Sequence, residues 1–227
     1  MVIDKFKHLR TTLFGNTEPS VKLEFITTSP KMDTQNIPVC SAAVSYGSIN
    51  KLDSQERMDS LTRNLKKRKH LTPFESVTYG LHIQGISKAC GAQLSRYRMS
   101  GHISASRRYA TQKERFVYPI LEKVDDEALA KECYSFFEHQ VKLASMTYSK
   151  LRDLGISKQD SRLVIPVCSS TERIMWVNAR SLFHVFDERL QPDAEVEIRR
   201  LCYLILDVVK KETPLLFEEY RDEYRDE

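Results

Sequence analysis

Arginine recurs beside small polar residues and carboxamides in three separate stretches of this sequence. The stretches are residues 93–98, residues 106–109 and residues 178–180, and Arg189 follows the third. A guanidinium group offers a planar fork of donors that fits phosphate and base carbonyl oxygens, and a carboxamide can both donate to and accept from a base edge. Each stretch alone is a weak signal, but together they indicate binding of a phosphate-bearing nucleotide.

Positive charge is concentrated around the first two stretches. Eleven basic residues lie between Lys66 and Arg115, against only Glu75 and Glu114, which gives +9 in that segment. Because the whole chain carries a formal charge of +4, the other residues sum to −5. A solvated basic face would explain the surplus, and we expect this for the helix end at residues 66–69. The arginines interleaved with tyrosine and serine suit a phosphate- and ring-binding surface better, with nucleic acid and mononucleotide ligands equally open.

Other sources of chemistry are poorly represented. The chain lacks the glycine-rich Rossmann and P-loop patterns, and its six histidines never pair at the spacing of helical metal ligands. We therefore expect no bound metal. The five cysteines are scattered and odd in number, which is typical of reduced thiols. Pro-Val-Cys occurs twice, at Cys40 and Cys168, so a nucleophilic cysteine is kept as an alternative.

Hydrophobic periodicity predicts the elements that must position these residues. Alternating apolar residues predict strands, and apolar residues spaced by three and four predict helices. The predicted strands are residues 21–28, 77–84 and 174–177. The predicted helices are residues 54–69, 86–98, 125–154, 157–163 and 178–189, with a last one opening at Pro192. The arginines at residues 93–98 would then follow a strand, and we expect the apolar stripe of the 125–154 helix to be mostly buried.

These elements predict one α/β domain over residues 1–227. No segment rich in glycine, proline or serine divides the chain, and 41% hydrophobic residues suffice for a packed core. No run of about 18 apolar residues is present, and the first residues lack a secretory apolar core, so we expect a soluble, cytoplasmic protein without a membrane span. The tandem tetrapeptide at the end predicts a frayed tail over residues 221–227.

The order of the arginine stretches, together with two further segments, resembles the flavin-dependent thymidylate synthase family. The further segments are residues 70–75 (His-Leu-Thr-Pro-Phe-Glu) and residues 161–166 (Ser-Arg-Leu-Val-Ile-Pro). The resemblance spans roughly residues 41–217, which is most of the chain. It implies an α/β (α+β) domain with a mixed or antiparallel sheet flanked by long helices.

The family's signature motif, R-H-R-x-x-S-x-N-E-x-S-x-R-Y, corresponds to residues 96–109. The chain keeps the motif's three arginines, its second serine and its tyrosine. It departs at four positions, where Tyr97, Gly101, Ile103 and Ser104 replace histidine, serine, asparagine and glutamate. In the family, these four positions contact flavin and shape the substrate and folate pocket.

The resemblance implies which residues form a pyrimidine nucleotide site. Arg189 and Ser106 are the implied catalytic residues. A guanidinium beside N3 of uracil would favour the anionic form of the ring and raise the nucleophilicity of C5. The implied substrate-binding residues are Gln93, Arg96, Ser104, Ser106, Arg107, Arg108, Arg162 and Arg189.

The resemblance also implies a flavin site and two co-substrates. The implied FAD-binding residues are Ser45, His70, Thr72, Arg96, Tyr97, Arg98, Asn178, Arg180 and His184. Tyr97 can stack or hydrogen-bond where the family has an imidazole, but it cannot carry a positive charge. The implied reaction converts dUMP to dTMP with methylenetetrahydrofolate and NADPH as co-substrates, in a homotetramer whose sites lie between subunits.

Two alternatives to methylation of dUMP stay open. The departures at Ile103 and Ser104 change which hydroxyls and carbonyls a pocket can satisfy, so the chain could methylate UMP or hydroxymethylate a pyrimidine nucleotide. The other alternative is a non-catalytic protein that binds a nucleotide or a nucleic acid through the basic segment, although the resemblance makes nucleic acid the less expected partner. Arg162 and Arg180 could also simply pair with acids such as Asp160 or Asp187.

Overall fold

The computed structural model describes residues 4–10, 17–106 and 115–220, and its centre is a single antiparallel sheet. The strands are β1 (Ser20–Ile26), β2 (Thr78–Ser87), β3 (Ser100–Ser104) and β4 (Ser170–Asn178). They lie in the order β1-β2-β4-β3, and each neighbouring pair is antiparallel. The predicted α/β (α+β) class with an antiparallel sheet is confirmed.

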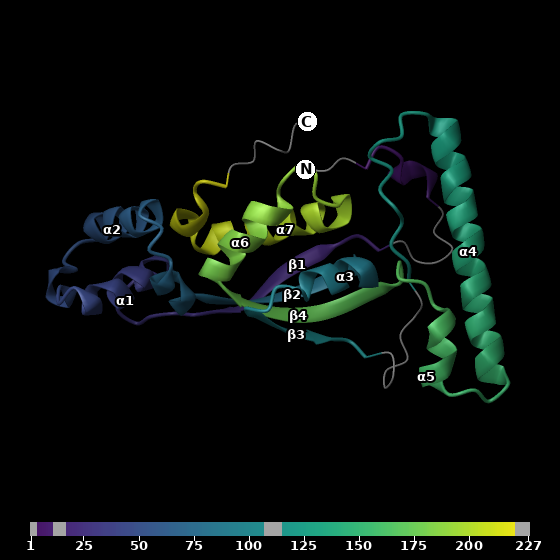
Figure 1. Cartoon of the computed structure of the whole chain (residues 1–227), viewed down its shortest axis with the longest axis horizontal. Coiled ribbons are helices and arrows are strands. Elements are labelled where there is room, and N and C mark those ends of the chain that lie inside the picture. Colours follow the sequence, from purple (N-terminus) through teal and green to yellow (C-terminus); the bar gives the residue numbers. More distant parts are fainter. Residues whose placement is uncertain (1–3, 11–16, 107–114, 221–227) are drawn as a thin grey trace.

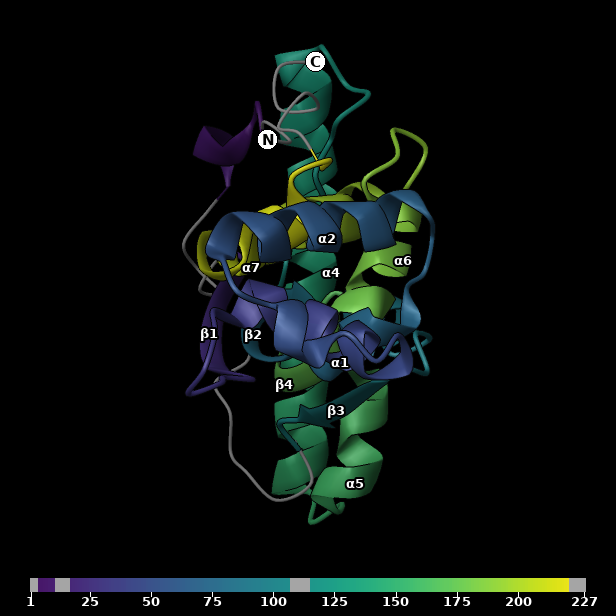
Figure 2. The ribbon, with the colours of Figure 1, turned by 90° about the vertical axis from the view of Figure 1, so that its left-hand side faces the viewer.

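Helices cover one face and both ends of this sheet (Figure 1). The α-helices are α1 (Ile37–Ser45), α2 (Gln55–Lys67), α3 (Lys88–Leu94), α4 (Glu127–Asp153), α5 (Lys158–Ser161), α6 (Ala179–Arg189) and α7 (Val196–Glu212). Helices α3, α6 and α7 pack on one face, α1 and α2 lie at one end, and α4 and α5 lie at the other. Viewed from the end that carries α1 and α2, α4 runs behind the sheet (Figure 2). Of the described helices, none is long and apolar enough to cross a membrane.

The main core lies between the sheet and helices α6 and α7. Strand β2 alternates as a half-covered strand should, with Tyr79, Leu81 and Ile83 fully buried on the helix side. Apolar residues of α6 and α7, such as Leu182 and Ile205, fill the space above them. Each fully buried aliphatic or aromatic side chain contributes roughly 1.5–3 kcal/mol through removal from water, so this layer fixes where α6 begins relative to β4.

A second, smaller core lies against α4. It contains Phe6, Tyr118, Ala130 and Tyr134, which are all buried. The expectation that the apolar stripe of this helix is mostly buried is wrong. Phe136 is 70% exposed, and the large apolar side chains at 129, 143 and 146 are also exposed. The outer side of α4 is therefore an uncovered apolar surface in the single chain.

The largest differences from the predicted elements fall around the signature motif. Residues 86–98 were predicted as one helix, but β2 continues to Ser87, where pairing with β4 outweighs helix propensity. The Ser87 hydroxyl caps α3 by accepting from the N–H of Cys90, and the helix ends at Leu94. The motif then continues as β3, which was not predicted. The helix α1 was also missed, and the predicted strand at 174–177 begins earlier, at Ser170.

The basic helix end at residues 66–69 is only partly the solvated surface that was expected. The Lys66 side chain is just 12% exposed and pairs with Glu219. Its ammonium also lies 4.9 Å from the ring centroid of Phe183, and burial lowers its pKa. The predicted frayed tail at residues 221–227 lies outside the described residues, and the single-domain assignment stays a prediction.

Candidate functional site

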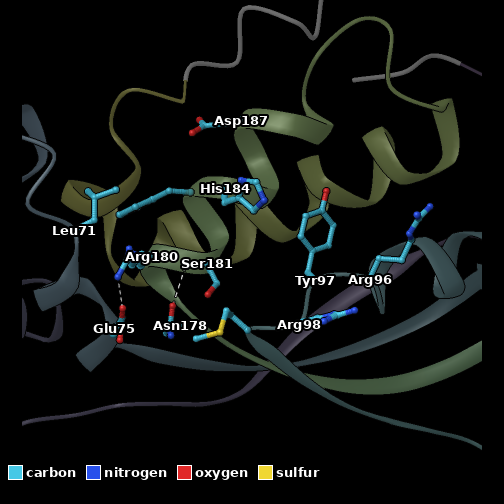
Figure 3. A pocket seen from close by; sticks show the side chains of 12 residues that line it. Leu71, Glu75, Arg96, Tyr97, Arg98, Asn178, Arg180, Ser181, His184 and Asp187 are labelled. Atoms are coloured by element: carbon cyan, nitrogen blue, oxygen red, sulfur yellow. Dashed lines mark hydrogen bonds and ion pairs between the residues drawn. The ribbon is translucent and has the colours of Figure 1, made fainter.

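A pocket of about 700 Å³ opens where β4 ends and α6 begins (Figure 3). Its walls come from three separated parts of the chain: residues 71–75 before β2, residues 96–99 between α3 and β3, and residues 178–187. The pocket brings together six of the nine residues that the resemblance assigns to FAD, namely Arg96, Tyr97, Arg98, Asn178, Arg180 and His184. Residues about eighty positions apart in the sequence therefore share one cavity.

The first turn of α6 lines this pocket because Asn178 caps the helix there. Asn178 has an extended backbone (φ −85°, ψ 163°), and its side-chain oxygen accepts a hydrogen bond from the N–H of Ser181 at 2.8 Å. The N–H of Ala179 is also bonded, to the carbonyl of Val77 at 2.8 Å, so the positive end of the helix dipole is what favours a bound anion here. The end of β4 thus places the N-terminus of α6, which can attract a phosphate group, at the pocket wall.

Arginine side chains add positive charge to the same wall. Arg180 forms an ion pair with Glu75, which also lines the pocket (Figure 3). The alternative considered from the sequence, a pair with Asp187, is not formed among the described residues. Arg96 and Arg98 are exposed, and within the described parts of the chain neither forms an ion pair. Two guanidinium groups are therefore available to a ligand at the pocket mouth.

Tyr97 lines the pocket and connects it to Arg189. The Tyr97 side chain is only 9% exposed, and its hydroxyl donates to Glu188 at 2.8 Å. The same hydroxyl accepts from Nε of Arg189 at 2.6 Å, and the Arg189 guanidinium carbon lies 5.6 Å from the ring centroid of Tyr97. Burial and the neighbouring Glu188 carboxylate raise the pKa of Tyr97 to about 12, so the phenol is protonated at neutral pH.

The other three residues assigned to FAD, Ser45, His70 and Thr72, line a second, smaller pocket of about 210 Å³. It lies between α1 and the short turn Thr72–Ser76, which precedes β2. Because Glu75 of this turn lines the large pocket, the turn borders both cavities. The FAD residues predicted from the resemblance thus fall in two pockets that share one wall.

The residues assigned to the nucleotide substrate are more scattered. Arg96 lines the large pocket. Arg189 is not among the lining residues, but its Nε donates to the hydroxyl of Tyr97, which is. Gln93 lies at the end of α3 and donates to Glu195, and Ser104 is the last residue of β3. Ser106 follows β3 and is exposed. Residues 107 and 108, the assigned arginines of the second stretch, lie outside the described residues.

Arg162 lies far from these residues within one chain. It opens the turn Arg162–Val164, which packs on α4 and α5 at the opposite end of the sheet from Asn178 (Figure 1). The alternative of a pairing with Asp160 does not occur among the described contacts. The Asp160 carboxylate instead accepts from the hydroxyl of Ser157, and Ser157 caps α5 by accepting from the N–H of Asp160. A single chain therefore does not join Arg162 to the pocket.

The structure explains one departure from the signature motif by steric fit. Gly101 of β3 pairs with Trp176 of β4, and a Cβ added to Gly101 would overlap the indole ring. On the other side of Trp176, Gly80 of β2 is covered by the ring of Phe25 in the same way. A side chain at position 101 would therefore have to displace the indole ring, a constraint that could be found only once the strand register was known.

A second departure from the motif, Ser104, lies opposite a buried arginine that no sequence motif indicated. Ser104 pairs across the strands with Arg173, whose side chain is only 6% exposed. Arg173 donates to the carbonyl of Gly91 and to the hydroxyl of Ser95, both at 2.8 Å, and burial lowers its pKa. Where the family motif has glutamate, this chain thus places serine opposite a guanidinium group whose acceptors, within the described part of the chain, are the neutral groups of Gly91 and Ser95.

Neither metal chemistry nor a thiolate nucleophile gains support at this site. Among the residues that the structure describes, no three histidine, cysteine or acidic side chains are grouped to hold a metal ion. Burial raises the pKa of the Cys168 thiol, which opposes formation of the reactive thiolate. Cys168 and Cys40 also lie outside the residues that line the large pocket.

Comparisons with known proteins place this geometry in a family. The family model described as thymidylate synthase complementing protein matches residues 28–215. The flavin-dependent thymidylate synthase of Halobacterium salinarum is 30% identical over 204 residues, which cover 80% of this chain and 82% of that protein. The enzyme of the same name from Thermosipho africanus is 29% identical over 194 residues, covering 80% and 84%.

A solved structure has the same fold. The crystal structure of the UMP/dUMP methylase PolB from Streptomyces cacaoi, bound with 5-Br dUMP, superposes with a TM-score of 0.80 and 21% identity. The match covers 90% of this chain and 95% of that chain. Since the family model spans most of the sequence and brackets every residue of the large pocket, this chain belongs to the thymidylate synthase complementing protein family and is a methyltransferase-like enzyme.

Proposed function

We propose that this enzyme methylates C5 of a uridine nucleotide, converting dUMP to dTMP with FAD, methylenetetrahydrofolate and NADPH. The observation that carries the proposal is the joint placement of Arg96, Arg98, Asn178 and Arg180 around one pocket. Membership of an enzyme family with these relatives argues against the alternative of a non-catalytic nucleic-acid binder.

The pocket residues fit a flavin dinucleotide. A volume of about 700 Å³ lies within the range of roughly 300–1,000 Å³ that is usual for cofactor sites. The α6 N-terminus and the free guanidinium groups of Arg96 and Arg98 suit the pyrophosphate, and Leu71 and Phe183 offer apolar surface for a ring. When bound, FAD would supply the redox equivalents for reducing the transferred one-carbon unit, and the protein contributes binding and orientation.

Arg189 would act on the pyrimidine ring itself. Its Nε is held by the Tyr97 hydroxyl, so the two terminal amino groups of the guanidinium remain as donors. Donors placed at the N3 edge and the adjacent carbonyl of uracil would stabilise the ring with N3 deprotonated. The negative charge is shared with C5, and this raises the nucleophilicity of C5 without a cysteine adduct.

The nucleotide phosphate and sugar would be held by Gln93, Arg96, Ser104, Ser106, Arg107 and Arg108, with Arg162 completing the site from another copy of the chain. Two observations support the shared site. Arg162 lies at the far end of the sheet from the pocket, and α4 carries an exposed apolar surface suited to subunit contacts. We therefore include the homotetramer in the proposal.

A complementation experiment tests the shared site. Arg96→Ala and Arg162→Ala should each abolish release of tritium from dUMP labelled at C5. When the two inactive variants are co-expressed and purified as mixed oligomers, some sites combine the unmodified Arg96 of one copy with the unmodified Arg162 of another. The proposal predicts that activity returns to roughly a quarter of that of the unmodified enzyme, by random assortment. Mixed oligomers that stay inactive would contradict it.

UMP is a second candidate substrate, favoured by a specific observation. Ser104 is smaller than the motif glutamate and uncharged, and it lies opposite Arg173 in the strand register, so a nucleotide held by Ser104 would meet one negative charge fewer. The protein with the same fold is named a UMP/dUMP methylase. Comparing turnover of dUMP and UMP by the same preparation distinguishes the two, and exclusive use of dUMP would reject the second.

A further inference from the structure

Four side chains form a continuous chain at the wall of the large pocket: Arg189, Tyr97, Glu188 and His184. Two of them, Tyr97 and His184, line the pocket. Nε of Arg189 donates to the Tyr97 hydroxyl at 2.6 Å, and that hydroxyl donates to Glu188 at 2.8 Å. The other carboxylate oxygen of Glu188 lies 3.3 Å from Nε2 of His184. The rings of Tyr97 and His184 meet edge to face at a centroid distance of 5.8 Å.

The Tyr97 hydroxyl lies between the guanidinium group of Arg189 and the carboxylate of Glu188, and it forms a hydrogen bond with each. Within the described residues, Arg189 makes no ion pair with an acid, although Glu188 is its neighbour in sequence. A direct bidentate pair with a carboxylate would occupy two guanidinium donors and offset the charge. Because the neutral phenol takes only Nε, the charge and the terminal amino groups of Arg189 stay available.

The ring of Tyr97 also restricts where the guanidinium can lie. The guanidinium carbon is 5.6 Å from the ring centroid, within the range of a cation–π contact. Two separate contacts with one buried side chain therefore fix the Arg189 head group. A histidine at position 97, as in the family motif, has a different reach and can itself become a cation, so the positioning by Tyr97 departs from what the motif residue would do.

We propose that Tyr97 is a positioning residue for the pyrimidine reaction: it aims Arg189 at the uracil ring and keeps the cation free of a direct carboxylate partner. The proposal rests on the proposed function, because it takes Arg189 as the group that meets the ring. Tyr97 itself touches Arg189 and the pocket, so it links the cofactor side of the site to the nucleotide side.

Ionisation of a bound nucleotide tests this directly. The probe is 5-bromo-dUMP, whose ring absorbance changes when N3 loses its proton, measured as a difference spectrum against the same enzyme without probe. In the unmodified enzyme, Arg189 should lower the N3 pKa of the bound probe relative to the free probe. In Tyr97→Phe, the pKa should return toward the free value by about one unit, a tenfold change in the ionisation constant.

Other charges in the pocket are constant between these two proteins. The acidic and basic side chains that line it are Glu75, Arg96, Arg98, Arg180, His184 and Asp187. The matched control is Tyr118→Phe, which removes another buried phenol that donates to a carboxylate, Glu138 at 2.9 Å, in the separate core beneath α4. This control should leave the probe's pKa as in the unmodified enzyme.

Substitution of Glu188 tests the orientation of Tyr97 without changing Tyr97 itself. Glu188 is exposed, so Glu188→Ala and Glu188→Gln should both fold. Both remove the carboxylate charge, but only glutamine keeps an acceptor for the Tyr97 hydroxyl, so the probe's pKa should be higher in Glu188→Ala than in Glu188→Gln. An unchanged pKa in Tyr97→Phe with normal probe binding would overturn the positioning role alone. Failure of the unmodified enzyme to bind the probe at all would instead overturn the proposed function.

Discussion

Restoring the family serine at position 101 should destabilise this protein. A Cβ at Gly101 would overlap the ring of Trp176, its partner across the strands, which is exposed on the sheet surface (38%) and lies over this glycine. Overpacking of this kind costs about 1–3 kcal/mol. Replacing glycine within a strand would otherwise gain about 0.5–1 kcal/mol from lower backbone entropy in the unfolded chain. The net expectation for Gly101→Ser is a loss of about 1–2 kcal/mol in the free energy of unfolding.

A double-mutant cycle with Trp176→Val measures the clash. For a chain of this length, a loss of 1–2 kcal/mol corresponds to a fall in Tm of about 2–8 °C. In the Trp176→Val background the obstacle is gone, so Gly101→Ser should be neutral or stabilising by up to about 1 kcal/mol. The coupling energy between the two positions should therefore be about 1–3 kcal/mol. Since Trp176 is the sole tryptophan, its emission spectrum also reports whether the indole moves in Gly101→Ser.

Two results would refute this reasoning. The first is a Gly101→Ser protein that is as stable as the unmodified protein or more stable, with unchanged tryptophan emission. The second is an equal loss of stability with and without Trp176, which would show that the cost does not come from the indole ring.

Two further substitutions test the elements that support the pocket. Asn178→Ala removes the α6 cap and should cost about 1 kcal/mol, whereas Asn178→Asp keeps the acceptor for the Ser181 N–H and should not; equal thermal unfolding of both variants would contradict the capping role. Burial raises the pKa of Glu197, which accepts from the N–H and the hydroxyl of Ser87, so the folded state holds a proton that the unfolded state has lost. The stabilisation from this proton is fully present below the ordinary pKa of about 4.3, and it is lost as the pH rises through the folded-state pKa. The free energy of unfolding of Glu197→Gln should therefore lack this fall with pH when unfolding is measured at several pH values. The same pH dependence in both proteins would contradict the role of Glu197.

Sequence periodicity was sufficient for the long elements. The strand at 77–84 and the helices at 54–69, 125–154 and 178–189 were predicted close to their observed bounds, because each has a clear hydrophobic pattern and a cap or a breaker at an end. The short helix α1 and the strand β3 were missed. Strand β3 has only five residues, one of them glycine, and it exists through pairing with β4, which local propensity cannot report.

The residues of the candidate site could likewise be predicted only in part from the sequence. The motif order indicated that Arg96, Arg98, Asn178 and Arg180 belong together, and the structure places them around one pocket. Arg173 was overlooked because it lies in no motif, and its importance depends on burial and on the cross-strand register with Ser104. The bond between Tyr97 and Arg189 likewise joins residues 92 positions apart, and no spacing rule predicts it.

The mass of the product shows most directly whether this enzyme methylates a uridine nucleotide. The full-length enzyme, loaded with FAD, is incubated with methylenetetrahydrofolate, NADPH and equal concentrations of dUMP and UMP, and the nucleotides are analysed by mass spectrometry. We expect a uridine nucleotide heavier by one CH₂, formed only when FAD, the folate and NADPH are all present, and lost in Arg189→Ala. A nucleotide pool of unchanged mass, with a folded enzyme that binds FAD, would contradict it.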